Sequence, residues 1–406
     1  MKVKWIRSFS ILFITGILST CIEPFDRGIT GFQSLLVVDA LLTNRASYNC
    51  IKLTRTKETS EEPPEKVKGA VILIRDDTGN ETAMNEVFDG VYKPENPTYS
   101  GLPGREYTLY IRTPDGSEYL SDPVIMPEER QVDTLYFGKD SEWLPDGTIQ
   151  EGVRVYIDSK DHPGNPYYRW TYEEWWEFNA PTPKLFEYRD RNHITEIPIA
   201  NITCWKNNIS KEIQIESSET GSGTPIIKKP VLFIPSEESD RLLVQYCIEV
   251  SQFSISRSEY EYWDQLKQIS EAGGDIFDKQ PFNINGNIHS LSRSGEQVLG
   301  YFQVSSVSTR KEYLTRKEID KMNLPRYFYE CEMAVVGPGD PETDIIGSPV
   351  TFDMIYWYFT VNGYIFIQPV YNDENKLERL MFVKNSCSDC RLTGSPVKPD
   401  FWTDMK

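Results

Sequence analysis

The sequence predicts a mainly β protein with two folded domains and one or two short helices. Apolar and polar residues alternate with a period of two over many short stretches, and clusters of Gly, Pro, Asn and Asp separate these stretches. Only one stretch, residues 258–272, clearly combines a helical spacing of apolar residues with signals for both helix ends. The chain of 406 residues is long enough to bury its cores without help from disulfide bonds.

The first 20 residues have the pattern of an export signal, and Cys21 stands where a lipoprotein signal places the lipidated cysteine. Three basic residues precede an apolar run at residues 9–18, which is too short to span a membrane. The alternative is an uncleaved core helix, which the basic residues before the run and Pro24 after it disfavour. We therefore expect a signal peptide at residues 1–20 and a lipidated tether at residues 21–33.

Residues 34–127 are expected to form a small β-sandwich of short strands. Its clearest hairpin spans residues 107–121, where Pro114 sets φ for a type I turn and Gly116 accepts the left-handed conformation after it. The stretch at 101–107 before the hairpin resembles the transthyretin or carboxypeptidase-regulatory type of immunoglobulin-like module. This resemblance implies an immunoglobulin-like or transthyretin-like sandwich for the N-terminal domain.

Residues 128–406 are expected to form a larger β-rich domain. Period-two alternation predicts strands at residues 167–175 and 242–253. Between them, residues 179–235 contain six prolines and few alternating stretches, so we expect a long loop-rich insertion there.

A helix and a hairpin are predicted within this larger domain. Ser258 and Glu261 have the spacing of a capping box that would start the helix at 258–272. Alternating aromatic residues on both sides of Asn362-Gly363 predict two strands, 352–361 and 364–371, joined by a type I′ turn.

The strongest candidates for binding residues are the aromatic side chains of the strand that begins at Tyr167. Trp170, Tyr172, Trp175 and Trp176 would form a platform for a ligand or partner if they were exposed, because aromatic rings stack on sugars and anchor partner proteins. The alternative is core packing, which strict alternation along one strand favours.

Several short motifs of the larger domain look like one family: Tyr167-Tyr168-Arg169-Trp170, Phe277-Asp278-Lys279-Gln280-Pro281, Gly286-Asn287-Ile288, Val298-Leu299-Gly300-Tyr301-Phe302, and Cys387 and Cys390 with Phe401-Trp402. The chain resembles an uncharacterised family of Bacteroidota envelope lipoproteins that carry a domain of unknown function. Its members often occur beside TonB-dependent receptors. The resemblance implies an outer-membrane lipoprotein, and Glu23 and Asp26 match in part the acidic signal that favours surface display in that lineage.

Six cysteines remain after Cys21, and an oxidising compartment allows them to form disulfides in any of fifteen pairings. The spacing of Cys387 and Cys390 could also indicate a redox pair or half of a zinc site. However, no helix pattern follows it and no second Cys-x-x-Cys completes a zinc set. We expect Cys331 to bond Cys387 or Cys390, since closing a long loop near the chain end stabilises the fold. The alternative is buried free thiols.

No catalytic motif, cofactor motif or metal site is predicted. The chain contains three histidines, none of them in a His-Glu-x-x-His spacing, and it has no nucleophile elbow or phosphate loop. Asp340, Glu342 and Asp344 lack the glycine and closing glutamate of a calcium-binding hand. The net charge of −18 becomes −21 when the three basic residues of the signal are removed, so nucleic acid is not an expected partner.

Three functions remain open. The first is capture of a small-molecule, glycan or peptide ligand beside a TonB-dependent receptor or similar β-barrel, for which we expect an aromatic pocket. The second is an envelope scaffold or outer-membrane assembly factor, for which a flat apolar patch is expected. The third is a lipid-anchored hydrolase, which requires converging carboxylates in a cleft. The sequence favours the first.

Overall fold

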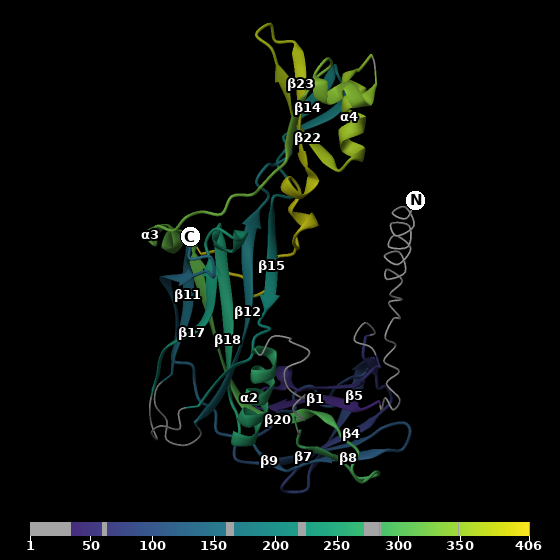
Figure 1. Cartoon of the computed structure of the whole chain (residues 1–406), viewed down its shortest axis with the longest axis vertical. Helices are drawn as coiled ribbons and strands as arrows, with labels where there is room; N and C mark the ends of the chain where they lie inside the picture. The colour runs from purple at the N-terminus through teal and green to yellow at the C-terminus, as the bar shows by residue number, and fades with distance from the viewer. Residues whose placement is uncertain are drawn as a thin grey trace, which may run out of the picture.

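The computed structural model describes residues 34–58, 63–159, 166–217, 225–271, 284, 286–347 and 349–405. The predicted signal peptide and tether, with Cys21, Glu23 and Asp26, lie outside the described residues. Strands account for 48% of the structure and helices for 14%, which confirms the mainly β fold. Three parts follow one another along the long axis of the molecule, and the N-terminal strands extend sideways at its base (Figure 1).

The N-terminal part is a path of hydrogen-bonded strands, in the order β1-β2-β6-β5-β4-β7-β8-β19. Alternation sets its core: Leu36, Val38, Ala40 and Leu42 of β1 are fully buried. The strands are β1 (Leu36–Thr43), β2 (Cys50–Arg55), β3 (Glu65–Lys66), β4 (Val71–Asp76), β5 (Glu81–Phe88), β6 (Val91–Pro94), β7 (Glu106–Arg112), β8 (Glu118–Ser121), β9 (Val124–Ile125) and β19 (Ile288–Ser290).

Residues from much later in the chain complete this N-terminal core. Strand β20 (Leu299–Thr315) lies parallel to β1, and its Phe302 and Val304 belong to the same buried cluster. Gly300 makes this close approach possible, because a Cβ atom there would lie 1.9 Å from the Val38 carbonyl oxygen. The N-terminal part is therefore joined to the rest of the molecule by one long strand as well as by the connecting segment at residues 126–133.

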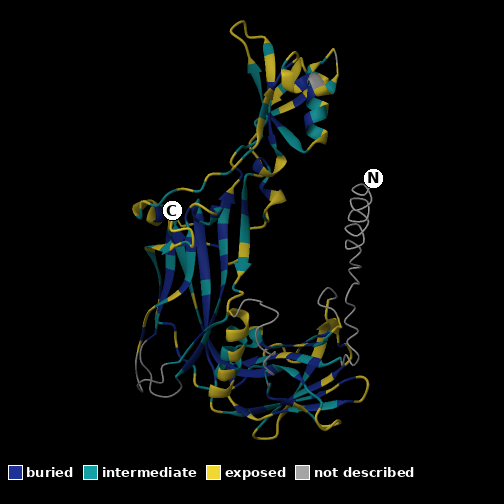
Figure 2. Cartoon of the chain, viewed as in Figure 1, coloured by how far each residue is buried: buried dark blue, intermediate teal, exposed yellow. Residues whose placement is uncertain are grey.

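The central part consists of two packed sheets. One has the order β10-β11-β17, and the other continues from β20 through β18 and β12 to β15, with β16 also paired to β12. Figure 2 shows their buried residues in dark blue along the upright strands. The strands are β10 (Thr134–Trp143), β11 (Ile149–Ser159), β12 (Tyr167–Asn179), β15 (Thr203–Ile209), β16 (Gln214–Ser217), β17 (Ile226–Pro235) and β18 (Gln245–Ser254).

Residues 179–235, expected as a loop-rich insertion, contribute strands to three sheets, one of which is a hairpin at residues 186–196. Strand β17 pairs with β11, and β15 and β16 pair with β12, so this segment builds part of the central core. Its prolines lie where they interrupt pairing least: Pro230, for example, sits at a register shift of edge strand β17.

The C-terminal part is a small three-stranded sheet covered by a helix and a hairpin. Strands β21 (Met333–Val336), β23 (Leu377–Lys384) and β22 (Tyr364–Tyr371) form the sheet. Helix α4 (Phe352–Val361) and the hairpin of β13 (Phe186–Asp190) and β14 (His193–Glu196) pack on it. Thus two segments distant in sequence, residues 186–196 and 333–384, form this small unit.

The predicted type I′ hairpin at Asn362-Gly363 is wrong, because residues 352–361 form helix α4. Thr351 caps the helix by accepting a hydrogen bond from the Met354 amide, and Asn362 with φ −91° ends it. Gly363 adopts φ +81°, the left-handed conformation that commonly follows a helix.

The predicted helix at 258–272 is confirmed as α2 (Arg257–Glu271), but its predicted capping box is wrong. The hydroxyl of Ser256 accepts the Glu259 amide hydrogen bond at 3.1 Å, so the helix begins two residues earlier than the box at Ser258 requires. The Glu259 side chain is fully buried and accepts a hydrogen bond from Ser305. A third helix, α3 (Arg316–Lys321), follows β20.

Candidate functional site

A groove of about 610 Å³ lies where the central sandwich meets the C-terminal part of the chain. We call it the aromatic groove. Strand β12 supplies its floor, a loop at residues 237–240 forms one wall, and the segment 327–330, here called the strap, forms the other. Its lining includes Trp176, Phe178, Ala180, Pro181, Lys206, Glu237, Glu238, Ser239, Asp240, Tyr327, Phe328, Tyr329, Glu330, Ser386, Cys387 and Thr393.

Alternation along β12 places Trp176 and Phe178 side by side on the groove floor. Strand register sets Lys206 of β15 opposite Trp176, and its ammonium group lies 4.1 Å from the centre of the Phe178 ring. This is a cation–π distance, so the lysine is held over the floor. Both rings are almost fully buried, and they therefore give the groove a rigid base.

Asp240 joins the floor of the groove to both walls. Its carboxylate accepts hydrogen bonds from Trp176 Nε1 at 2.8 Å, Lys206 Nζ at 2.7 Å and Tyr329 Oη at 2.9 Å. The side chain is 5% exposed. A buried carboxylate with three donors, one of them charged, is well compensated for the loss of water. Asp240 thus fixes two aromatic residues from distant parts of the sequence in one geometry.

The strap carries the most exposed ring of the groove. Phe328 is 80% exposed, whereas its neighbours Tyr327 and Tyr329 are half-buried and pack edge to face at 5.1 Å. Burial, together with the nearby Asp240 carboxylate, raises the pKa of both tyrosines. They therefore stay neutral and keep their hydroxyl groups as hydrogen-bond donors.

A second buried network lies next to the groove floor, on the same face of β12 as Trp176. Glu174 of β12 is fully buried and accepts hydrogen bonds from Tyr246 at 2.6 Å and Asn208 at 2.8 Å. It also forms an ion pair of 3.0 Å with Arg241, whose guanidinium lies 5.3 Å from the Trp176 ring centre. Burial and the Glu174 carboxylate raise the pKa of Tyr246, so this tyrosine remains a donor.

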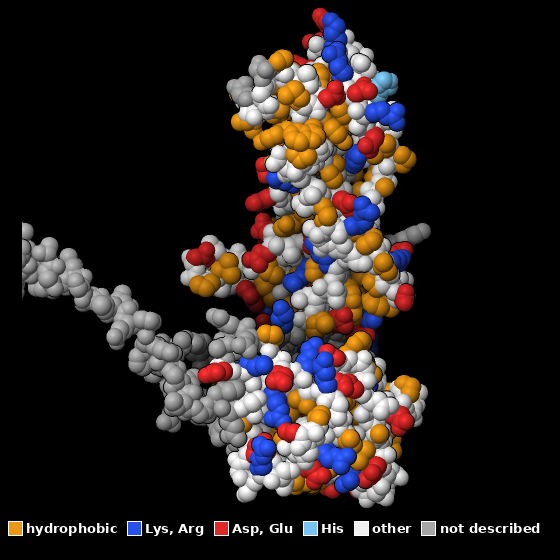
Figure 3. All heavy atoms as spheres, turned by 90° about the vertical axis from the view of Figure 1, so that its right-hand side faces the viewer, with side chains coloured by type: hydrophobic (Ala, Val, Ile, Leu, Met, Phe, Trp, Pro, Cys, Tyr) orange, Lys and Arg blue, Asp and Glu red, His pale blue; other side chains and the backbone are white. Residues whose placement is uncertain are grey.

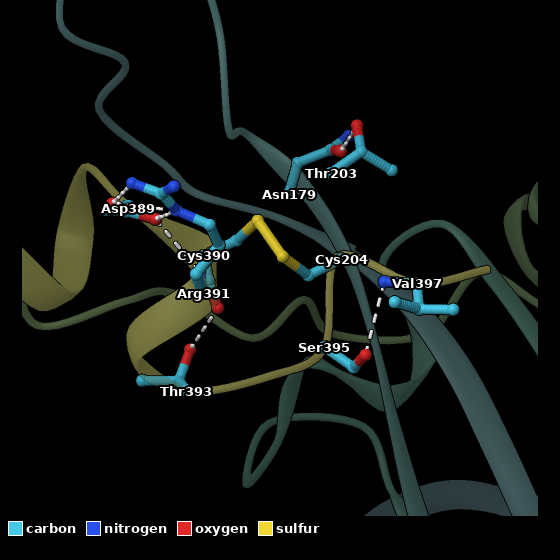
Figure 4. The surroundings of a disulfide bond; sticks show 9 residues. All are labelled: Asn179, Thr203, Cys204, Asp389, Cys390, Arg391, Thr393, Ser395 and Val397. Carbon is cyan, nitrogen blue, oxygen red and sulfur yellow. Dashed lines mark hydrogen bonds and ion pairs between the residues drawn. A yellow bond between two sulfur atoms is a disulfide. The ribbon is translucent and has the colours of Figure 1, made fainter.

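Two disulfide bonds attach the C-terminal segment to other parts of the chain, one at the end of the strap and one in β15. Cys331 at the end of the strap is bonded to Cys387, as the sequence led us to expect. Cys204 of β15 is bonded to Cys390, a pairing across 186 residues that the sequence did not indicate (Figure 4). Cys50 and Cys247 are free thiols. The two cysteines of the Cys-x-x-Cys motif are thus bonded to two different segments.

Among the predicted platform residues, only Trp176 lines the groove. Trp170 and Tyr172 are buried in the core between the two central sheets, where Trp170 Nε1 donates to Gln252 at 2.9 Å. Trp175 points to the opposite face of the sheet and packs against Phe401 at 4.7 Å. The four aromatic residues do not form one platform, because β12 is covered on both of its faces.

Of the acidic residues considered for calcium, Asp340 is held by other groups of the protein. Asp340 accepts a hydrogen bond from the Gly337 amide at 2.7 Å and pairs with Arg379. Within the described ranges, no three His, Cys, Asp or Glu side chains cluster in a way that could hold a metal ion. His193 and His289 contact Asp190 and Asp122 at the surface.

A larger hollow of about 790 Å³ opens between β16 and β17 at the edge of the sandwich. Several of its charged residues already have partners: Arg154 pairs with Asp140 and Glu142, and Lys229 pairs with Glu216. The aromatic groove is the better candidate, because it combines a rigid aromatic floor with an exposed ring and with acidic side chains exposed at its rim.

Residues 22–311 match the family model described as a domain of unknown function, DUF4249. The chain belongs to this family. The match includes the groove floor and the loop at residues 237–240 but ends before the strap. No curated protein and no solved structure matches the chain. In the part of this DUF4249 protein that the structure describes, none of the helices has the length and apolar character needed to cross a membrane.

Proposed function

We propose that this DUF4249 protein is a lipoprotein of the outer membrane, anchored through Cys21 and displayed on the cell surface, which captures a ligand for a TonB-dependent receptor or a similar β-barrel. The aromatic groove is the observation that carries the proposal. Its volume of about 610 Å³ is that of an ordinary ligand site.

The groove is suited to capture because its walls are held in place before a ligand arrives. Asp240 fixes Trp176 and Tyr329, and the Cys331–Cys387 bond fixes the end of the strap. Preorganised walls lose little conformational entropy on binding, and so more of the contact energy appears as affinity. The exposed Phe328 ring then offers the first contact surface for a ligand.

A scaffold role is the second candidate, and one surface favours it. Met354, Trp357 and Val361 of α4 are 37%, 64% and 59% exposed and lie on the face of the helix opposite the C-terminal core. Hydrophobic side chains gather on the upper part of the molecule in the view of Figure 3. Exposed apolar stripes of this kind serve as contact sites for other proteins.

Purification of the lipidated protein from envelope membranes tests the proposal. We expect the wild-type protein to bring a β-barrel receptor with it, together with a small molecule, glycan or peptide that mass spectrometry detects. Phe328→Ala should reduce the amount of that bound ligand, whereas Phe88→Ala, which removes a 74% exposed ring far away in the N-terminal part, should not. Capture is refuted if both variants retain the ligand equally. If Trp357→Ala alone abolishes receptor recovery and no ligand is found, the scaffold role is correct.

A further inference from the structure

We infer that the aromatic groove binds an extended polypeptide segment rich in lysine or arginine. This inference rests on the proposed function and names the class of ligand that the groove takes. Three features of the groove support it: the charge of its lining, the rings on its walls and the unpaired backbone of the strap.

The lining of the groove is strongly acidic. It contains the four carboxylates of Glu237, Glu238, Asp240 and Glu330 but only one ammonium group, that of Lys206. Asp240 and Lys206 neutralise each other at 2.7 Å, so the remaining charge belongs to the three glutamates. These glutamates are exposed at the rim, where they attract a cationic ligand and remain accessible to it.

The rings of the strap add a second preference for cations. Lysine and arginine side chains bind over aromatic faces, as Lys206 already does over Phe178 at 4.1 Å. Phe328 presents such a face to solvent, being 80% exposed beside Glu330. An exposed ring next to a carboxylate binds both the apolar stem and the charged end of a basic side chain.

The backbone of the strap favours a peptide over other cations. The strap crosses from α3 to β21 as an open segment outside any strand (Figure 1). Within the described part of the chain, the backbone groups of Tyr327, Phe328 and Glu330 make no hydrogen bond to another backbone group. An extended peptide that lies along the strap would pair with these groups as an added strand does. Its alternate side chains would then point toward the aromatic floor and toward the acidic rim.

Binding of short synthetic peptides to the purified full-length mature protein tests this inference. The main probe is a capped eight-residue peptide of alternating lysine and leucine, compared with the same peptide carrying glutamate in place of lysine. Fluorescence anisotropy should show at least about tenfold tighter binding of the lysine peptide at low salt, and high salt should reduce this difference. Equal affinity for the two peptides would overturn the inference.

Substitutions of groove residues test whether the lysine peptide binds in the aromatic groove. Phe328→Ala should weaken binding of the lysine peptide about fivefold, in line with loss of one cation–π contact, whereas Phe88→Ala should leave it unchanged. Likewise, Glu237→Gln combined with Glu330→Gln should weaken binding at low salt, and Glu95→Gln, at an exposed acid of the N-terminal part, should not. If the groove variants bind as tightly as the two controls, the inference is overturned.

Two further probes separate a peptide from other cations. A lysine peptide methylated at alternate backbone amides should bind markedly more weakly, because it cannot pair fully with the strap. A tetramer of glucosamine carries amines on a sugar chain, and tighter binding of this tetramer than of the lysine peptide would overturn the peptide assignment. All these assays use purified protein. They can therefore fail while the protein still recovers a receptor from membranes, which separates this inference from the proposed function.

Discussion

Asp240 has the largest structural role of any single residue in the groove. It lies at the start of the short turn before β18, and it accepts hydrogen bonds from residues of β12, β15 and the strap. Its partners Trp176 and Tyr329 are 64 and 89 residues away in sequence. One buried carboxylate thus positions the floor and one wall relative to each other.

Asp240→Ala should destabilise the protein by about 3–5 kcal/mol, because it leaves Lys206 without its ion-pair partner and leaves the buried Trp176 and half-buried Tyr329 donors without an acceptor. Urea unfolding followed by tryptophan fluorescence measures this change. Asp373→Ala, at an exposed acid in the turn between β22 and β23, is the matched control and should change stability by less than about 0.5 kcal/mol. Equal effects of the two substitutions would show that Asp240 does not hold the groove together.

The free thiol of Cys247 allows a further prediction for a single residue, since the reactivity of a thiol depends on pH. Burial raises its pKa to about 12, so roughly one molecule in ten thousand carries the reactive thiolate at pH 8. Iodoacetamide should therefore leave Cys247 unlabelled in the native protein at pH 8 and should label it after unfolding in urea, as peptide mass spectrometry detects. Rapid labelling of Cys247 in the native protein would contradict its buried position.

The sequence predicted one binding residue of the groove, Trp176, but not the groove itself. Alternation identified the aromatic residues of β12, but it could not say which face of that strand would be covered by a second sheet. Lys206, Asp240 and the strap were missed, because nothing local links them to Trp176. The run Tyr327-Phe328-Tyr329 just before Cys331 was the one available signal, since three consecutive aromatic residues cannot all face a core.

At the scale of elements, helix α4 shows where pattern analysis is ambiguous. Apolar residues occupy nearly every position of this segment, so both a period of two and a helical period fit. Ile355 and Phe359, one helical turn apart, are its buried residues, which shows that packing on the C-terminal sheet favours the helix. Thr351, just before the predicted strand, and Asn362-Gly363, interpreted as a turn, were in fact signals for the two ends of a helix.

Gly363→Ala should destabilise the protein by about 1 kcal/mol, because Gly363 has φ +81° and an alanine there is strained even though space is open around it. Thermal unfolding followed by circular dichroism measures the effect. Gly138→Ala in β10 is a suitable control, since Gly138 does not have a positive φ and its added methyl group meets only the Tyr156 ring. A melting temperature that falls more for Gly138→Ala than for Gly363→Ala would contradict the proposed end of α4.

At the scale of the whole molecule, two disulfides hold the C-terminal part against the central sandwich. The bonds close loops of 56 and 186 residues, and in the chain-entropy model each contributes roughly 4–5 kcal/mol. One end of each bond lies in the short segment from Cys387 to Cys390, which is beside the groove. The groove walls therefore depend on an oxidising compartment, which agrees with the proposed location outside the cytoplasm.

Removal of the Cys331–Cys387 bond should loosen the strap more than the rest of the molecule. In the double variant Cys331→Ala with Cys387→Ala, we expect faster hydrogen exchange at residues 327–332 and unchanged exchange in β1 and β7. The double variant Cys204→Ala with Cys390→Ala is the control, and it should increase exchange mainly at the end of β15 and at residues 390–395. The same exchange pattern in both variants would show that neither bond acts on the strap specifically.

Photo-crosslinking in intact cells tests most directly whether the aromatic groove is the binding surface of a receptor-associated lipoprotein. A photoreactive phenylalanine replaces either Phe328 in the groove or Phe88 in the N-terminal part, both of which are highly exposed. We predict that position 328 forms adducts with an outer-membrane β-barrel or with the ligand it takes up, and that position 88 does not. Adducts with the barrel from position 88 and none from position 328 would contradict the assignment of the groove.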